Sequence, residues 1–257
     1  MKIEIAVPVL NEERELEPSI LKMLSRLEGE EFYKRHDWKL IIADNGSSDG
    51  TSGIAAGLAS RFPVRVGFVR VERAGVGLAL KTCWGASRAD IIGYFDLDIA
   101  TDLRHVRQAV EAVELGCDLV YGTRLHRDSR VYGRSLWRET TSRVFNLLLR
   151  TYLGAKFSDG QCGFKFLKRS VYETLLGAGA QSDGWFFATE LLMAAQRAGL
   201  RMCELPVDWT DSSDSRVNVI PLSLEYLKAM RALKRRVPAG KSRCPTANSG
   251  RGGYRSR

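Results

Sequence analysis

The chain has 257 residues, of which 44% are hydrophobic and 27% charged, and this fits one globular α/β domain with additions better than two independent domains. No run approaches the roughly 18 consecutive apolar residues that a membrane-spanning helix needs. Residues 1–10 also lack the layout of a secretory signal peptide, so we expect the protein body to lie in the cytoplasm.

The cysteines form no CxxC pair and are odd in number, which argues against a disulfide framework and against a zinc site. We expect them to be small buried hydrophobic side chains in a reducing compartment. They are Cys83, Cys117, Cys162, Cys203 and Cys244.

The net charge of +9 is concentrated at the C-terminal end. From Arg231 onward the chain carries nine Lys or Arg residues and no acidic residue, so the rest of the chain is close to neutral. A basic end on a neutral body favours an anionic surface as partner. It does not favour nucleic acid, because residues 238–257 offer one aromatic side chain, Tyr254, for stacking on bases. This Gly-, Ser- and Arg-rich tail is expected to be disordered.

Short apolar runs alternate with helical patterns through the first half of the chain. The alternation predicts a mostly parallel sheet with right-handed crossovers, flanked by helices. The expected strands are Ile3–Val9, Trp38–Asp44, Val64–Val69, Ile91–Phe95 and Asp118–Tyr121. The expected helices are Glu12–Leu27, Thr51–Arg61, Gly77–Ser87 and Leu103–Leu115.

The second half of the chain is less regular. Residues 124–150 carry seven arginines, with an apolar stretch at 144–149. Leu222–Val237 has apolar residues at helical spacing and basic residues on the other side, which predicts an amphipathic helix. We therefore expect a main domain over 1–221, a basic amphipathic helix over 222–237 and a disordered basic tail over 238–257.

Polar, turn-rich residues follow three of the expected strands, at 11–12, 44–51 and 96–101. They should line one rim, because parallel sheets bind ligands outside the carboxyl ends of their strands. Asp96 and Asp98 stand two positions apart at a strand end, so both carboxylates can meet one cation. Hard divalent ions that hold diphosphates take such oxygen ligands, although aspartates at strand ends also serve simply as turn residues.

Two further segments each allow two interpretations. Asp44–Thr51 is either a polar loop that caps the next helix or a nucleotide site, in which Asp44 accepts hydrogen bonds from a base or ribose and Asp49 fixes the loop. Gly75-Val76-Gly77, with Lys81 one helical turn further on, is similar to a phosphate loop. However, Leu80 stands where the P-loop and the dinucleotide-binding motif both need glycine. A helix N-terminus near a diphosphate is still compatible with this segment.

Taken in series, these segments resemble family 2 glycosyltransferases, and most of all the dolichyl- or polyprenyl-phosphate sugar transferases of the glucosyl branch. Any one motif is weak, whereas six in order over residues 3–220 are specific. The resemblance implies a single GT-A-type α/β domain and an inverting, metal-dependent hexosyltransferase. The segments that carry it are Val7–Glu13, Asp44–Thr51, Asp96–Asp98, Asp159–Lys165, Trp185–Leu192 and Leu205–Trp209.

The motifs and the resemblance together give the expected site residues. Asp96 and Asp98 would hold a Mg²⁺ or Mn²⁺ ion. The catalytic residues would be Asp98, Lys165 and Glu190. Nucleotide-sugar binding is expected for Pro8, Glu12, Asp44, Asp49, Gly77, Lys81, Asp96, Arg124 and Arg216, and acceptor binding for Gln161, Gly163, Phe164 and Lys165.

Two positions depart from the family pattern. Ala100 stands where some relatives carry a third metal-facing polar residue, so the metal preference of this chain can differ. Val76 stands where relatives often have Lys, which removes one expected phosphate contact.

The expected donor is UDP-glucose or GDP-mannose, and the expected acceptor is a polyprenyl or dolichyl phosphate. A phosphate acceptor is already an anion and needs no strong base. The alternative acceptor, a hydroxyl of a glycan or polysaccharide, needs a carboxylate to take its proton, for which Glu190 or, less favourably, Asp183 is the candidate. A lipid acceptor also implies peripheral docking on an anionic membrane at its cytoplasmic face, through Leu222–Val237 and the arginines of 124–150.

Overall fold

The computed structural model describes residues 1–211 and 219–236 of the chain. The first half supplies β1 (Lys2–Val9), α1 (Leu16–Glu28), α2 (Glu31–Lys34), β2 (Asp37–Asp44), α3 (Thr51–Arg61), β3 (Val66–Arg70), α4 (Val76–Ala86), β4 (Ile91–Phe95), α5 (Arg104–Glu114) and β5 (Leu119–Thr123). The second half supplies β6 (Arg130–Tyr132), α6 (Leu136–Leu153), β7 (Phe164–Lys168), the 3-10 helix η1 (Arg169–Val171), α7 (Tyr172–Gly177), α8 (Phe187–Arg197), β8 (Met202–Pro206), β9 (Asp208–Thr210) and α9 (Val219–Arg236).

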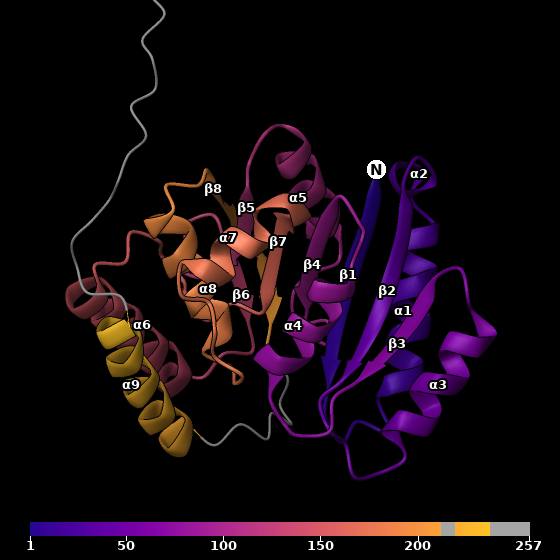
Figure 1. The fold of residues 1–257 in the computed structure, drawn as a ribbon, viewed down its shortest axis with the longest axis horizontal. Coiled ribbons are helices and arrows are strands. Elements are labelled where there is room, and N and C mark those ends of the chain that lie inside the picture. The colour runs from indigo at the N-terminus through magenta and orange to yellow at the C-terminus, as the bar shows by residue number, and fades with distance from the viewer. Residues whose placement is uncertain (212–218, 237–257) are drawn as a thin grey trace, which may run out of the picture.

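A seven-stranded sheet in the order β3-β2-β1-β4-β7-β5-β8 forms the centre of the molecule (Figure 1). Neighbouring strands run parallel except at β7, which is antiparallel to both β4 and β5. The mostly parallel α/β sheet predicted from the alternating pattern is therefore confirmed. Each strand and helix expected in the first half is present, although α1 begins at Leu16 because the residues before it form a turn.

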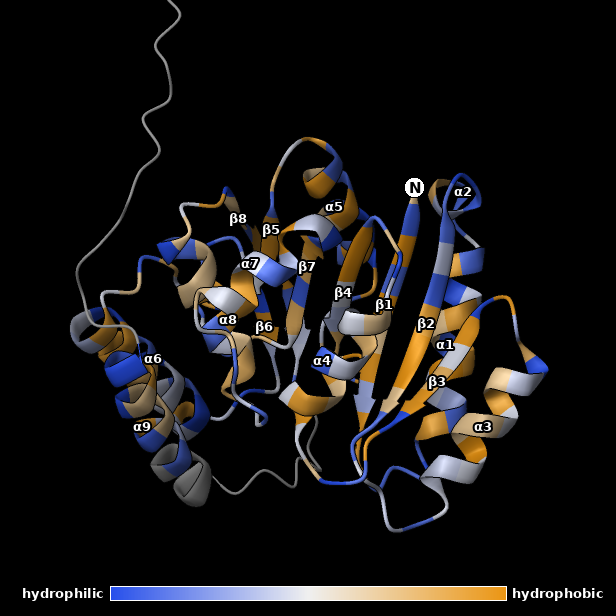
Figure 2. Cartoon of the chain, in the orientation of Figure 1, coloured by the Kyte–Doolittle hydropathy of each residue, from blue (hydrophilic) through white to orange (hydrophobic). Residues whose placement is uncertain are grey.

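Helices cover both faces of the sheet, and the strand residues alternate between the two layers. Ile5 and Val7 of β1 pack into the cluster formed with α1, α3 and α5, whereas Ala6 packs into the cluster formed with α4, α7 and α8. Figure 2 shows how strongly apolar residues are concentrated along the strands. A sheet buried on both faces gives the near-continuous apolar runs from which the strands were predicted.

The antiparallel strand β7 was not predicted. It enters between β4 and β5, with Tyr94 opposite Lys165 and Phe95 opposite Phe164. The pairing of β7 with β4 places residues 161–165, the segment expected to bind the acceptor, at the end of β4. This segment therefore lies beside the Asp96–Asp98 pair.

The amphipathic helix expected over 222–237 is present as α9, and it packs against α6 at one margin of the molecule (Figure 1). Tyr226, Met230 and Leu233 of α9 are buried in the core cluster, and the ring of Tyr226 lies 5.0 Å from that of Phe145 on α6. The apolar side of α9 is thus used mainly for folding. Nowhere in 1–211 or 219–236 is there a helix long and apolar enough to cross a membrane.

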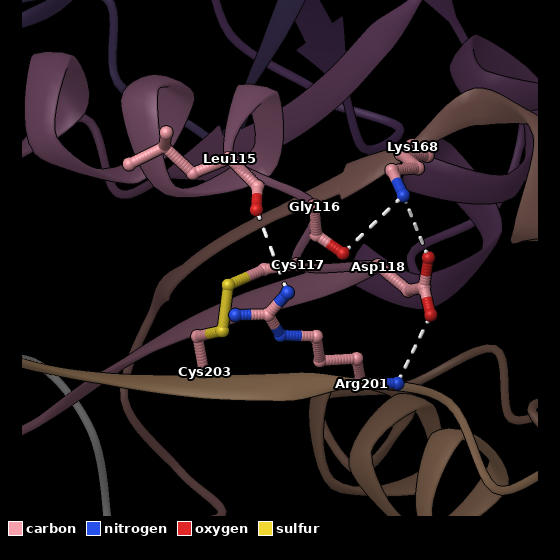
Figure 3. Close-up of a disulfide and its surroundings, with 7 residues drawn as sticks. All are labelled: Leu115, Gly116, Cys117, Asp118, Lys168, Arg201 and Cys203. Carbon is pink, nitrogen blue, oxygen red and sulfur yellow. Dashed lines mark hydrogen bonds and ion pairs between the residues drawn. A yellow bond between two sulfur atoms is a disulfide. The ribbon is translucent and has the colours of Figure 1, made fainter. Parts of the chain in front are cut away.

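The prediction that the chain lacks a disulfide was wrong, because Cys117 and Cys203 are joined (Figure 3). Their positions are 86 residues apart in the sequence, but β5 and β8 are neighbours in the sheet, which brings the two Cα atoms to 6.0 Å. Sequence spacing could not reveal this proximity. The cysteine count therefore gives no argument for a reducing compartment. Cys83 and Cys162 are free and buried, as expected.

Polar contacts surround this disulfide. The Asp118 carboxylate accepts hydrogen bonds from Lys168 Nζ at 2.8 Å and from the Arg201 backbone N–H at 3.0 Å (Figure 3). Together they fasten β8, the edge strand, to β5. β8 is followed directly by β9, which contains Trp209. Cys244, Arg216 and the tail over 238–257 lie outside the described residues.

Candidate active site

The carboxyl ends of β2, β1 and β4 lie side by side, as predicted for the polar rim. The β1–β4 pairing runs from Ile3 to Ala6 and stops before Pro8, whereas the β1–β2 pairing continues to Val9. Proline has no N–H to donate to a ladder. The sheet order reverses between β1 and β4, and ligands of α/β sheets bind at such a switch point.

The loops that follow β1 and β2 are locked together. Asn11 adopts a left-handed conformation with φ of 55°, and its side-chain oxygen accepts a hydrogen bond from Ser48 N at 2.9 Å. Asp44 is fully buried at the end of β2; it accepts a hydrogen bond from Ser47 N at 2.9 Å and another from the Ser52 hydroxyl. These contacts fix Asp44 at the rim, where a nucleobase was expected.

Glu12 and Asp49 join the same two loops through Thr51. The Glu12 backbone N–H donates to the Thr51 hydroxyl oxygen at 2.8 Å. The Asp49 carboxylate accepts from the Thr51 hydroxyl at 2.6 Å and from its N–H at 3.0 Å, and the hydroxyl contact lowers the pKa of Asp49. Asp49 therefore fixes the loop, as the sequence predicted for it.

Asp96 and Asp98 stand on a tight turn after β4. Ile99 has φ of 54°, a left-handed conformation that is rare and strained for a β-branched residue. The Ala100 N–H donates to Asp98 Oδ1 at 3.0 Å. Oδ1 of Asp96 is buried and makes no hydrogen bond with the residues described. Burial raises the pKa of Asp96 to about 7, and the charge of Asp98 adds to this rise.

This carboxylate pair suits a divalent cation. A buried carboxylate oxygen without a partner is costly unless it meets a proton or a cation. Within the described ranges, no group of three or more His, Cys, Asp or Glu could hold a metal ion. Two carboxylates are what Mg²⁺ commonly takes from a protein when phosphate oxygens complete its shell. The donor chemistry therefore fits Mg²⁺ or Mn²⁺ together with a diphosphate.

The pairing of β7 with β4 brings Gly163 and Lys165 close to Asp96 and Asp98. A Cβ atom on Gly163 would overlap the Asp96 carboxylate, so the glycine leaves that carboxylate its space. Lys165 is fully buried and donates from Nζ to the Cys162 carbonyl at 2.6 Å, and burial lowers its pKa to about 8. Phe164 instead points into the core, where its ring packs 5.0 Å from Phe166.

Arg124 is held by a buried acid that sequence reasoning had not singled out. Its Nε and Nη2 donate to the Asp159 carboxylate at 2.8 and 3.0 Å, and its guanidinium lies 4.8 Å from the centre of the Trp209 ring. Burial would raise the pKa of Asp159, but Arg124 holds it at about 2. The Gln161 N–H also donates to Asp159, at 3.1 Å. Asp159 thus links Arg124, expected to bind the nucleotide sugar, to Gln161, expected to bind the acceptor.

Three more polar residues near the site were not predicted. Arg134 Nη1, Ser142 Oγ and Asp211 Oδ2 are buried and lack hydrogen-bond partners among the described residues. Asp211 is close enough to raise the pKa of Asp98, after the effect of burial. Burial and then the charge of Arg124 lower the pKa of Arg134. Only the three-dimensional arrangement separates Arg134 from the other arginines of 124–150.

Gly77 and Lys81, the residues expected beside the diphosphate, face a different loop. A Cβ atom on Gly77 would collide with the backbone of Ser182, so this glycine permits close packing of α4. Lys81 Nζ donates to Asp183 Oδ1 at 2.6 Å and to the Gln181 carbonyl at 2.7 Å. Arg73 pairs with the same Asp183.

Glu190, the candidate base, is fully buried, and both of its carboxylate oxygens already accept hydrogen bonds. Its Oε2 accepts from the backbone N–H groups of Gln181 and Ser182 at 2.8 and 2.6 Å. Its Oε1 accepts from Arg236 of α9 at 2.8 Å. Glu190 therefore ties α9 to the loop that holds Lys81.

Residues 4–176 match the family model described as "Glycosyl transferase family 2". This match covers more than half of the chain. The chain belongs to glycosyl transferase family 2. The resemblance stated from the sequence motifs is thereby confirmed.

Two relatives are similar to most of this chain. "Glycosyltransferase AglD" of Haloferax volcanii is 36% identical over 221 residues, which are 86% of this chain and 35% of that protein. "Dolichyl-phosphate beta-glucosyltransferase ALG5C" of Trichomonas vaginalis is 26% identical over 226 residues, 83% of this chain and 65% of that protein. The chain thus spans about a third of the length of the first relative and just under two thirds of the second.

A solved structure shares the fold. Glucosyl-3-phosphoglycerate synthase from Mycobacterium tuberculosis, in complex with Mn²⁺ and UDP-glucose among others, matches with a TM-score of 0.62 at 23% identity. The match covers 91% of this chain and 79% of that one. The GT-A-type fold expected for this family is confirmed.

Proposed function

We propose that this chain transfers a hexose from a nucleotide-sugar donor to a polyprenyl or dolichyl phosphate at a membrane surface. The observation that carries the proposal is the Asp96–Asp98 pair at the switch point, in which Oδ1 of Asp96 has no hydrogen-bond partner among the described residues, together with the nearby cations Arg124 and Arg134. Two phosphate-bearing substrates require two kinds of group. An acidic pair binds the metal ion of the donor diphosphate, and basic groups bind the acceptor phosphate.

The donor binds at the rim formed by β1, β2 and β4. Asp44 would contact the base or ribose at this rim, and Asp96 and Asp98 would hold Mg²⁺ or Mn²⁺ with the diphosphate. When bound, the ion would supply charge stabilisation for the departing diphosphate. UDP-glucose is the first donor to test, because the similar ALG5C is named a glucosyltransferase and the similar solved synthase binds UDP-glucose with Mn²⁺. GDP-mannose is the second.

The acceptor phosphate binds against Arg134 Nη1 and Ser142 Oγ, which lack hydrogen-bond partners in the described parts of the chain, while Arg134 Nε forms an ion pair with Glu139 at 3.2 Å. Its oxygen attacks the anomeric carbon of the sugar; the bond from that carbon to the diphosphate oxygen breaks, and its electron pair leaves with the nucleoside diphosphate. The configuration inverts in this single displacement. Arg124 and Lys165 stabilise the negative charge on the reacting groups.

The occupied state of Glu190 favours a phosphate over a hydroxyl acceptor. A hydroxyl must lose a proton to a base, and both oxygens of Glu190 already accept hydrogen bonds. Asp183 is likewise engaged, by Arg73 and Lys81. A phosphate oxygen at neutral pH carries its charge without help from either residue.

The basic residues of the C-terminal helix support membrane attachment. Lys228, Arg231, Lys234 and Arg235 are exposed on α9. Each Lys or Arg near an anionic leaflet contributes about 1 kcal/mol at best, so several can hold a protein peripherally.

The proposal is tested with purified protein, Mg²⁺ or Mn²⁺, and a short polyprenyl phosphate in detergent. Labelled UDP-glucose and GDP-mannose are offered in separate reactions, and label is counted after extraction into organic solvent. The proposal expects lipid-soluble label from one donor, absent without metal. Donor cleavage without any lipid-soluble product would contradict it.

A further inference from the structure

The outward side of α6 is apolar along its whole length. Leu136, Trp137, Val144, Leu147 and Leu148 are all exposed, with Leu136 at 86% and Trp137 at 64% of full accessibility. At 100° per residue these side chains fall within an arc of about 120°. An exposed helix face normally carries polar residues, whereas this arc contains no charged residue.

The two polar residues within this arc do not make it hydrophilic. Thr140 donates its hydroxyl to the Leu136 carbonyl at 2.8 Å, and Thr151 donates to the Leu147 carbonyl at 3.0 Å. Each hydroxyl is thus satisfied inside the helix, and the threonine methyl group remains to face outward. The arc can therefore leave water without losing a hydrogen bond.

The opposite side of α6 is already used by the protein core. Ser142, Asn146 and Leu149 are buried, and Asn146 Oδ1 accepts from the Gly160 N–H at 2.8 Å. The helix is thus fixed by packing at its inner side. Packing against the core explains the residues on the inner side of α6. It does not explain why the exposed side is apolar as well.

Basic side chains border both edges of the apolar arc. Arg143 and Arg150 lie along one edge and are exposed, and Arg143 Nε also pairs with Glu139 of the same helix at 2.6 Å. Along the other edge runs α9, whose Lys234 ammonium sits 3.9 Å from the centre of the Tyr152 ring on α6. Figures 1 and 2 show the two helices side by side. The surface is an apolar strip between two rows of cations.

We propose that the outward face of α6 inserts into an anionic lipid bilayer, with the basic residues of α6 and α9 at the headgroups. Apolar side chains bounded by Lys and Arg and an aromatic residue suit the boundary between headgroups and acyl chains. A second copy of the chain is disfavoured, since a self-contact would bring rows of like charge together. Insertion places the segment just before α6, which carries Arg134, next to the lipid surface, while Ser142 lies on the buried side of the helix.

This inference rests on the proposed lipid-phosphate acceptor, but it is tested separately from it. The full chain is mixed with vesicles of phosphatidylcholine and phosphatidylglycerol, and bound protein is measured by flotation. The variant Leu136→Glu/Leu147→Glu replaces two exposed side chains that make no core contact. The matched control is Val64→Glu, another highly exposed apolar residue, at 71% accessibility, before β3.

We expect the double variant to partition onto vesicles at least tenfold less than wild type, while Val64→Glu binds as wild type does. Transfer to a short polyprenyl phosphate in detergent should be equal in all three proteins. Equal flotation of all three would overturn the inference, and so would a wild-type dimer in sedimentation that the double variant abolishes. Absence of detergent transfer in wild type would count against the proposed function instead, and leave the flotation result standing.

Discussion

Gly163 lies directly against the carboxylate of Asp96, because the pairing of β7 with β4 places the residue before Phe164 beside the residue after Phe95. A methyl group at this position would occupy the space of the carboxylate. The glycine therefore sets the orientation of Asp96 and with it the geometry of the proposed metal site.

Gly163→Ala should lower metal affinity and transfer activity by about tenfold or more, because Asp96 must turn away to avoid the new Cβ atom. Mn²⁺ binding by calorimetry and initial rates would measure this. Gly57→Ala is the control, since no atom of the described residues lies within 4 Å of the added Cβ in α3. It should keep full activity and gain up to about 1 kcal/mol of stability from helix propensity. Equal metal binding in both variants would refute the proposed role of Gly163.

Asp98→Ala should reduce transfer by about a hundredfold or more, because the metal would lose a ligand. The fold should stay intact, because Asp98 is an exposed turn residue outside the core. Circular dichroism would report the fold, and extraction of labelled lipid the activity. Wild-type turnover in this variant would rule out the metal-site assignment.

Stability without metal should fall as pH rises toward 7 and beyond, through Asp96. Its pKa is raised by burial from 3.8 to about 7, so the folded state holds a proton that the unfolded chain has released. The favourable contribution is complete below pH 4 and is lost as pH passes through 7. Asp96→Asn removes this dependence, which urea unfolding between pH 5 and pH 8 would detect. If the stability of Asp96→Asn depended on pH in the same way as that of wild type, the raised pKa of the buried Asp96 carboxylate would be contradicted.

His105 should give the opposite dependence. Its Nε2 accepts a hydrogen bond from the Asp208 N–H at 2.9 Å, which requires the neutral ring, and burial lowers its pKa from 6.5. Its contribution is therefore present above pH 6.5 and is lost as pH falls through the lower folded pKa. Wild type should lose more stability than His105→Gln between pH 7 and pH 5. An equal loss in both would show that His105 does not hold β9.

Reducing the Cys117–Cys203 disulfide should destabilise the protein by about 4.6 kcal/mol, the effect expected for closing a loop of this length. Thermal unfolding with and without dithiothreitol would measure the change. Cys117→Ser/Cys203→Ser should unfold at the temperature of reduced wild type and should not respond to the reductant. A wild-type protein insensitive to dithiothreitol would contradict the bond.

The polar rim could be predicted from the sequence because it depends on short-range rules. Asp44 and Asp96 each follow a buried apolar run, and the carboxyl ends of parallel strands align. The contacts of Glu190 could not be predicted, since a carboxylate on a helix gives no sign of the N–H groups that it will meet. The same holds for Cys117 and Cys203, which depend on a sheet order that local patterns do not encode.

The most direct test of the central claim compares two lipids of equal chain length, one a polyprenyl phosphate and the other the free polyprenol. Wild-type protein is given labelled UDP-glucose with Mn²⁺ or Mg²⁺, and labelled lipid is counted. The account predicts label in the phosphate lipid alone, with Arg134→Ala reducing it strongly. Transfer to the free alcohol, or to neither lipid while donor is consumed, would contradict a phosphate acceptor.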